Sequence, residues 1–448
     1  MRRSLTAILW GTFTLRFSTG LTGAMLLYYL AQLPHYGGAA VSSSVAAVMT
    51  AVYFATELVL SPVFGVLSDR IGAQRVMQVG PLLGAVAVLI TAAATNLWIL
   101  GGTRALEGMA AAASIPSILG YIAIVTSRDE GLRGRTVARF EAATVAGLGV
   151  GAVAAGPLFD LFGSLAFVLN AGVYAISFVI YRFLVAPVGT DAEALEKAED
   201  HPIGSAEVRP RELSWSRYAG LLSTPGVWLL APTWIALNAI IGAWTTQTVF
   251  QLVRENSDPQ LEDQLLMGGF EPTQVSIGLG VALAVFFAGI FVWGSLFRRF
   301  RRTSIMAIGI LGGIVMVAAV FGINHSADWS VAARIGLVLV GLGGIFVLAG
   351  ATPAALGMLA DISEIHPDDR GAIMGLYSVF LGLGQIVGSL VSGAAADWRG
   401  VDGLLIASLG LLLIALLPLR WLRDSEHLVG QPAAPPSTGA APGDPAAA

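Results

Sequence analysis

Cysteine is absent from the 448 residues, and charged side chains make up only 12% of them. The lack of cysteine excludes disulfides, thiolate metal sites and cysteine nucleophiles, and it carries no information about the compartment. The five histidines are scattered without the spacing of metal ligands, so we expect no metal and no cofactor. Soluble domains carry about 25% charged residues, and the scarcity of charge therefore excludes an ordinary soluble protein.

Long apolar runs take the place of the missing charge, with 55% hydrophobic residues and a mean hydropathy of +0.75. A helix needs ~20 apolar residues to cross a hydrocarbon core of ~30 Å, whereas a membrane β-barrel shows alternating segments of ~10 residues. The runs are continuous, so the sequence predicts an all-α polytopic membrane protein. We expect twelve spans near residues 5–33, 42–64, 76–94, 97–125, 135–159, 164–186, 226–252, 273–297, 303–323, 331–360, 371–396 and 401–422.

The basic residues predict the orientation of the spans. With the N-terminus inside, the external loops keep little beyond Arg254 and Arg399, whereas the cytoplasmic side collects most of the others, among them Arg70, Arg133 and Arg302. This asymmetry follows the positive-inside rule. We therefore expect an integral protein of a bacterial-type inner cell membrane with both termini in the cytoplasm.

Two polar segments divide the chain. The apolar pattern stops after the sixth span, and the tail is rich in Pro, Ala, Gly and Ser, too poor in apolar bulk to fold. The predicted parts are an N-terminal six-helix half (1–186), a cytoplasmic linker (187–225), a C-terminal six-helix half (226–422) and a disordered cytoplasmic tail (423–448).

An internal repeat indicates that the two halves are pseudo-symmetric. A shift of 237 positions places identical residues on one another across the fifth and eleventh spans. The pairs are Gly147 with Gly384, Gly151 with Gly388, Gly156 with Gly393, Asp160 with Asp397, and Gly163 with Gly400.

The stretch from Gly65 to Arg75, between the second and third spans, carries Asp69, Arg70 and Gly72 where a plain loop needs only polar filler. Glycines at both ends permit a tight reversal of the backbone. The stretch resembles the loop between the second and third helices of the major facilitator superfamily, whose pattern reads G-x-x-x-D-R/K-x-G-R/K-R/K. Ala73 and Gln74 stand where the pattern has two bases.

This resemblance implies a fold of two six-helix halves that works by alternating access. It also implies that Asp69 faces the N-terminus of the eleventh helix, where the helix dipole favours an anion, and so closes the cytoplasmic side. Asp129 and Glu130 are candidate partners for Arg70 or Arg75 in the same gate. The alternative is that Asp69 is an ordinary solvated loop charge.

Span four resembles the second motif of the family, with Arg104, Glu107 and Gly108, although glutamine is usual at the position of Glu107. Arg104 and Glu107 are three residues apart on one helix face and can pair. A charge at mid-span costs about 2.5–3.5 kcal/mol on insertion scales, so both should face the bundle or a wet cavity. We interpret them as proton-coupling or substrate residues, with a static neutralising pair as the alternative.

Isolated charges also lie deep in the first two spans, at Arg16 and Glu57, and are further candidates for proton coupling or substrate binding. Glu57 has no partner in its own span, so we expect it to bind the coupling proton, unless Arg16 reaches it. The second half has only neutral deep groups, which makes it the candidate substrate side. Its cavity candidates are Trp234, Asn238, Trp244, Gln247 and Gln385.

Span five carries Gly147, Gly151, Gly156 and Pro157 and resembles the third family motif, G-x-x-x-G-P, which is associated with proton-exchanging exporters. The glycine pair that normally follows is missing, and the glycine before Gly156 is one place early. The other interpretation is helix packing, because Gly147–Gly151 and Gly384–Gly388 are both GxxxG pairs that allow close backbone approach.

The sequence thus predicts a secondary transporter, not an enzyme, that exports an amphipathic or lipophilic small molecule coupled to protons. Uptake by proton symport and a lipid or glycolipid flippase are the alternatives within transport. A non-transporting membrane assembly factor on the same fold is a distant alternative. The expected partners are membrane lipid, protons and the small-molecule substrate, with no nucleic acid, and we expect a monomer.

Overall fold

The computed structural model describes residues 2–127, 129–187, 225–256, 258–296, 299–365 and 370–423. The predicted linker, apart from its first and last residues, and the predicted tail beyond residue 423 lie outside these ranges. Within the described residues every regular element is helical.

The described helices fall into an earlier and a later set. The earlier set is α1 (Arg2–Ala31), η1 (Leu33–Tyr36), α2 (Ser43–Ile71), α3 (Ala73–Met77), α4 (Val79–Ala93), α5 (Leu97–Val125), α6 (Glu130–Phe162), α7 (Leu165–Val179) and the π-helical η2 (Ile180–Leu184). The later set is α10 (Pro225–Val253), η3 (Pro259–Leu261), α11 (Pro272–Ser295), α12 (Arg302–Asn324), α13 (Val331–Leu348), α14 (Ala351–Ile365) and α15 (Arg370–Leu416).

Ten segments of the described chain are long and apolar enough to cross a membrane. The prediction of an all-α polytopic membrane protein is confirmed, while the count of twelve stays a prediction. Helix α1 is not among the ten, and one of them runs from Ser378 to Arg423, where two spans were expected. The backbone of α15 leaves helical geometry at Arg399 and Gly400, between those two expected spans.

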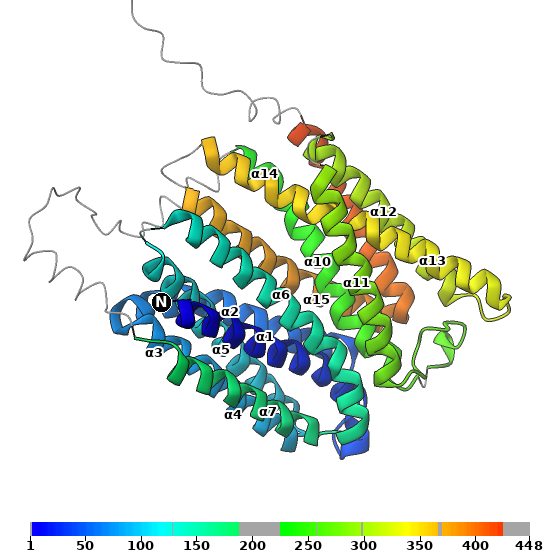
Figure 1. Ribbon diagram of the computed structural model, residues 1–448. Helices are drawn as coiled ribbons and strands as arrows, with labels where there is room; N and C mark the ends of the chain where they lie inside the picture. Colours follow the sequence, from blue (N-terminus) through cyan, green and yellow to red (C-terminus); the bar gives the residue numbers. More distant parts are fainter. Residues whose placement is uncertain are drawn as a thin grey trace, which may run out of the picture.

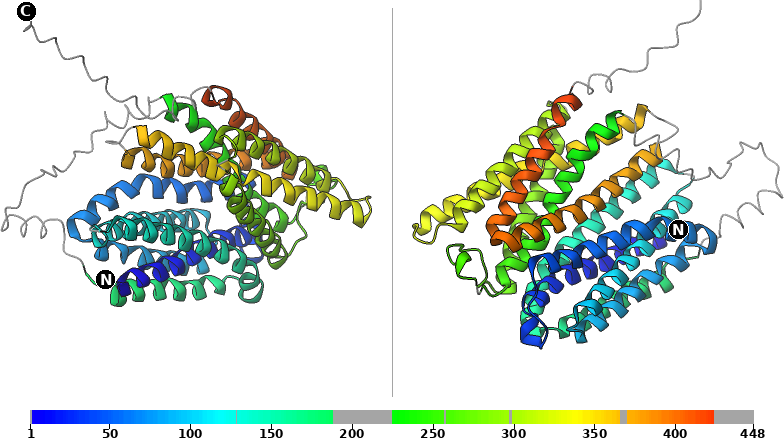
Figure 2. Two further views of the ribbon diagram at one scale, coloured as in Figure 1. Left: turned by 45° about the horizontal axis from the view of Figure 1, so that its top comes forward. Right: turned by 180° about the vertical axis from the view of Figure 1, so that it is seen from behind.

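The two sets of helices lie side by side (Figures 1 and 2). Helices α1, α2 and α6 of the earlier set pack against α10, α15 and α11 of the later set. Helices α4 and α7 lie on the far side of the first set, and α12 and α13 lie on the far side of the second (Figure 1). Most of the buried apolar side chains form two clusters. One lies within the later set, and the other lies mainly in the earlier set but includes Val249, Phe250 and Val253 of α10 and Val275 of α11.

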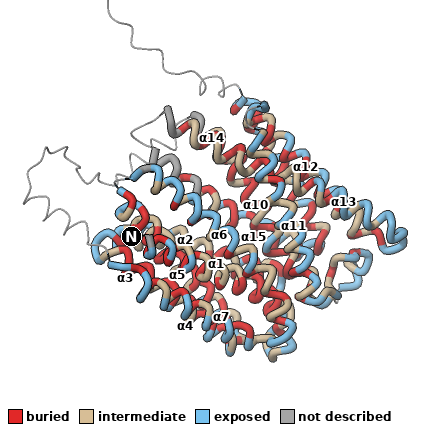
Figure 3. The backbone as a smooth tube through the Cα atoms, viewed as in Figure 1, coloured by how far each residue is buried: buried red, intermediate tan, exposed pale blue. Residues whose placement is uncertain are grey.

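Burial follows this arrangement. Buried residues line the helix contacts, and exposed residues cover the outer helices (Figure 3). Many exposed side chains on the outside are large and apolar, among them Phe291, Ile335 and Leu339. Because lipid tails are as apolar as these side chains, such a surface suits a protein surrounded by a bilayer.

Glycines set the closest helix contacts in both sets. A Cβ on Gly151 of α6 would lie 2.1 Å from the Phe17 carbonyl oxygen in α1, and a Cβ on Gly388 of α15 would lie 1.9 Å from the Ala239 carbonyl oxygen in α10. Gly147 and Gly384 repeat the contact one turn earlier, at 2.6 and 2.7 Å from the carbonyl oxygens of Phe13 and Ile235. Repeat-related glycines therefore make repeat-related contacts.

Candidate functional site

The charged residues of the first set stand on three helices: Arg16 on α1, Glu57 on α2, and the Arg104–Glu107 pair on α5. They lie around Tyr53 of α2, which interacts electrostatically with Arg16, Glu57 and Arg104. Helices α2 and α5 meet closely at Gly108, where a Cβ would lie 2.3 Å from the Tyr53 carbonyl oxygen and 3.2 Å from the Glu57 nitrogen. The glycine of the second family motif thus holds the α2 turn that carries Glu57 against α5.

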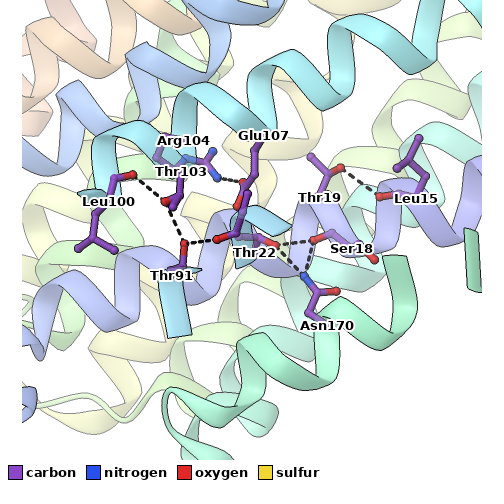
Figure 4. A network of polar contacts seen from close by, with 11 residues as sticks. Leu15, Ser18, Thr19, Thr22, Thr91, Leu100, Thr103, Arg104, Glu107 and Asn170 are labelled. Atoms are coloured by element: carbon purple, nitrogen blue, oxygen red, sulfur yellow. Dashed lines mark hydrogen bonds and ion pairs between the residues drawn. The ribbon is translucent and has the colours of Figure 1, made fainter. Parts of the chain in front are cut away.

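Arg104 and Glu107 form an ion pair within α5 (Figure 4). Both are buried, with 6% and 2% of their surface exposed, and the Arg104 guanidinium lies 4.7 Å from the centre of the Tyr53 ring. The second carboxylate oxygen, Oε1 of Glu107, has no hydrogen-bond partner among the described residues. The pair is therefore shielded from bulk solvent, and its charges depend mainly on each other.

Glu57 has a different environment, because it is only partly buried. Arg16 is 8% exposed and acts electrostatically on Glu57 and on Glu141 of α6. The expectation that Glu57 lacks a partner in its own helix was wrong, because the Tyr53 side chain hydrogen-bonds to it, and Arg16 also reaches it from α1. One guanidinium thus faces two carboxylates from two neighbouring helices.

Neutral hydrogen bonds fix the helices around these charges (Figure 4). Asn170 of α7 donates to the Thr22 hydroxyl at 2.7 Å and to the Ser18 carbonyl at 3.0 Å, which joins α7 to α1. Thr91 of α4 donates to the Thr103 hydroxyl of α5 at 2.9 Å. Hydrogen bonds therefore fix α1 to α7 and α5 to α4, and α1 and α5 carry three of the four charged groups.

The candidate substrate residues of the second set are mostly buried and already bonded. Asn238 donates to the Trp234 carbonyl of its own helix at 2.9 Å, and Trp244 donates to the Ser408 hydroxyl at 2.9 Å. Gln385 is 8% exposed and lies against Gly242 of α10. Gln247 donates to the Ser43 carbonyl of α2 at 3.2 Å, which places it at a contact between the two sets.

The stretch of the first family motif is more helical than expected. Helix α2 continues through Gly65 and Asp69 to Ile71, so the reversal rests on Gly72 alone, with φ of 96°. The expectation of a reversal that uses glycines at both ends was wrong, because the apolar face of α2 extends past Gly65. Arg70 and Arg75 are exposed.

Gln74 stands where the family pattern has a base, and it has a structural role of its own. It is 9% exposed and donates to the Val185 carbonyl at 2.6 Å, just after η2. A neutral amide can satisfy this buried carbonyl without placing a charge there. From the sequence alone, Gln74 was visible only as the replacement of a base.

Only some of the partners expected for the cytoplasmic gate lie among the described residues. Asp129 caps α6, since its Oδ1 accepts from the Leu132 N–H at 2.8 Å. Among the described side chains no ion pair joins Asp129 to Arg70 or Arg75. The side chain of Glu130 and residues 366–369, just before α15, lie outside the described residues.

Several hydrogen bonds between the two sets lie at one end of the bundle. This end carries residues 32–42 and 254–271, and we call it the Ser43 face. Tyr28 of α1 bonds to the Ser276 hydroxyl of α11 at 2.9 Å, and the Gly156 N–H donates to the same hydroxyl at 2.8 Å. The Ser43 hydroxyl accepts from Gln251 at 2.7 Å and from Arg254 at 3.1 Å.

Most of this interface was not predicted from the sequence, although the internal repeat pointed to part of it. The repeat had paired Asp160 with Asp397, and both side chains lie at the Ser43 face in contact with the opposite set. Gly156, taken as part of an exporter motif, also packs there, because a Cβ on it would lie 2.1 Å from the Pro272 carbonyl oxygen.

The family model of the Major Facilitator Superfamily matches residues 8–348 and 264–443 of this chain. The chain therefore belongs to the Major Facilitator Superfamily, whose members are transporters and not enzymes.

Two curated relatives are similar over most of their length. The quinolone resistance protein NorA of Staphylococcus aureus (strain MSSA476) is 20% identical over 404 residues, which cover 89% of this chain and 91% of that protein. The lysophospholipid transporter LplT of Yersinia enterocolitica is 25% identical over 357 residues, which cover 75% of this chain and 78% of that protein.

Solved transporter structures share the fold. The crystal structure of the nucleoside transporter NupG aligns with a TM-score of 0.66 at 14% identity, covering 94% of this chain and 98% of that one. A variant of the peptide transporter POT in complex with sulfate aligns with a TM-score of 0.67 at 16% identity, covering 96% and 95%. These likenesses concern the fold alone.

Proposed function

We propose that this chain exports an amphipathic or lipophilic small molecule in exchange for protons, by alternating access of its two six-helix halves. The observation that carries the proposal is the partly buried Glu57 beside Arg16, on two helices of the half that packs against the other. Arg16 reaches Glu57 but also acts on Glu141, so Glu57 is not locked in a closed pair and can change protonation as its surroundings change.

The second half supports the choice of an apolar substrate. Its deep polar groups are few, and Asn238 and Trp244 already donate hydrogen bonds to other residues of the same half. A sugar needs many free hydrogen-bonding partners, whereas a lipophilic molecule needs apolar and aromatic surface. The similarity to NorA is in keeping with export.

A lipid substrate is the second candidate, and the similarity to the lysophospholipid transporter LplT favours it. Proton symport in the uptake direction also remains compatible with buried carboxylates. We further propose that both termini lie in the cytoplasm of a bacterial cell, because the basic residues follow the positive-inside rule, and that the chain is a monomer in the inner membrane.

Transport by purified protein in proteoliposomes tests these alternatives. The probes are a fluorescent quinolone and a fluorescent lysophospholipid, each with a pH gradient imposed in either direction, and protein-free vesicles correct for passive entry of a weak base. Proton exchange predicts accumulation of the quinolone in vesicles with an acidic interior. Accumulation in an alkaline interior would instead establish symport, and gradient-independent movement of the lysophospholipid between leaflets would establish a flippase.

A further inference from the structure

Two aspartates hold equivalent places at the Ser43 face. Asp160 lies near the end of α6, three residues before Gly163, and Asp397 lies in α15, three residues before Gly400. The two glycines have nearly the same backbone geometry, with φ and ψ of 53° and −132° at Gly163 and of 57° and −134° at Gly400. Because L side chains rarely adopt this conformation, both chain turns depend on glycine.

Each aspartate reaches the start of a helix in the opposite half. Oδ2 of Asp160 accepts from the Thr273 N–H at 2.8 Å, in the first turn of α11. Oδ1 and Oδ2 of Asp397 accept from the N–H groups of Ser43 and Ser44 at 2.6 and 3.0 Å, in the first turn of α2. The first N–H groups of a helix lack partners within it, and the helix dipole favours a negative charge there.

One helical turn before each aspartate, a glycine brings the same two helices into close backbone contact. A Cβ on Gly156 would lie 2.1 Å from the Pro272 carbonyl oxygen, and a Cβ on Gly393 would lie 2.9 Å from the Ser43 carbonyl oxygen. The two glycines are related by the repeat that relates the two aspartates. The same device therefore occurs twice, once on each side of the pseudo-two-fold axis.

These hydrogen bonds exist only while the Ser43 face is closed, because each joins one half to the other. Both aspartates are already exposed to solvent, so when the halves separate there each helix start exchanges a charged acceptor for water, whereas the hydrogen bonds within each half remain. A contact made in one state and lost in the other shifts the equilibrium between them. A charged acceptor makes the stronger form of such a bond.

We propose that Asp160 and Asp397 are a pair of symmetry-related latches that hold the Ser43 face closed, and that their loss shifts the transporter toward the state open at this face. The proposal rests on alternating access, and it is independent of the substrate, the direction of transport and the coupling ion.

Distances between spin labels across the Ser43 face test the proposal in the full chain. The native sequence has no cysteine, so labels attach only at Ala39→Cys in the first half and Asp328→Cys in the second. Asp160→Ala and Asp397→Ala should each lower the ratio of the short-distance to the long-distance population by about two- to thirty-fold, the usual range for removal of a helix cap. The double variant should show the product of the two shifts.

The matched control is Asn96→Ala. Asn96 caps α5 at the same face by accepting from Trp98 and Ile99, within one half. This variant should leave the distance distribution unchanged. Asp160→Asn and Asp397→Asn keep one acceptor oxygen and lose the charge, so they should give smaller shifts in the same direction, and they replace any alanine variant that does not fold.

An unchanged distribution in the double variant, or in both asparagine variants where the alanine variants do not fold, would overturn the proposal. An equal shift in Asn96→Ala would overturn it as well, since capping in general would then be responsible. Failure of gradient-driven transport would contradict the proposed function and leave these distances unaffected, so the two failures are distinguishable.

Discussion

A side-chain carbon on Gly388 of α15 would lie 1.9 Å from the carbonyl oxygen of Ala239 in α10. That distance is shorter than any real contact of a Cβ with backbone, so the two helices can approach this closely only at glycine. Gly151 makes the corresponding contact with Phe17 in the first half, at 2.1 Å.

We therefore expect Gly388→Leu and Gly151→Leu to force these helices apart. Overpacking costs about 1–3 kcal/mol and occasionally more, and a clash with backbone belongs at the upper end. At least one variant should lose both expression and transport, with a lower Tm in any protein recovered. Thermal unfolding and the yield of monodisperse protein measure this. Gly172→Leu is the control, because a side chain there meets nothing within 4 Å; equal behaviour of all three variants would contradict the packing role.

Neutralising Glu57 and neutralising Glu107 should have different effects on transport. We expect Glu57→Gln to abolish gradient-driven accumulation of substrate and to retain downhill exchange, because it removes only the proton site. Glu107→Gln should impair binding or both activities, since it leaves buried Arg104 without its partner. Transport by proteoliposomes with and without a pH gradient measures both.

Glu262→Gln, in the exposed loop before α11, is the control for neutralising a carboxylate and should transport normally. If Glu57→Gln and Glu107→Gln both still concentrate substrate in response to a pH gradient, neither glutamate carries the coupling proton. Proton exchange would then lose its main physical support.

Breaking the buried Arg104–Glu107 pair of α5 should lower the stability of the protein. Arg104→Leu leaves the Glu107 carboxylate buried and unpaired, which we expect to cost about 3–5 kcal/mol. The double variant Arg104→Leu/Glu107→Leu removes both charges and should recover much of this loss, although transport should stay impaired if the pair has a functional role. Thermal unfolding and transport of the same samples distinguish the two effects; full transport by the double variant would make the pair purely structural.

Asp69 is predicted to hold the opposite face closed. Asp69→Asn should leave folding intact and weaken the state closed at that face, because an amide is a weaker partner for a helix N-terminus than a carboxylate. Spin labels at Ser127→Cys and Arg299→Cys, one in each half, should report a longer distance. Asp328→Asn, an exposed acid at the Ser43 face, should not. An unchanged distance with normal transport would reduce Asp69 to a loop charge.

The sequence by itself determined the helical membrane fold and most helix positions, because ~20 apolar residues in a row have few other solutions in a bilayer. It also determined that Arg104 and Glu107 share a helix face, because a spacing of three residues fixes this locally. The repeat at Gly388 and Asp397 was equally visible, since identical residues at a constant offset need no structure to be recognised.

Only the tertiary structure decided what these residues contact. It placed Arg16 within reach of Glu57, extended α2 past Gly65, and turned Asp160 and Asp397 toward helices of the opposite half. The contacts of Arg16, Asp160 and Asp397 join positions more than forty residues apart, and no local periodicity encodes them. They follow from how the two sets of helices meet, which depends on the shapes of whole helix surfaces.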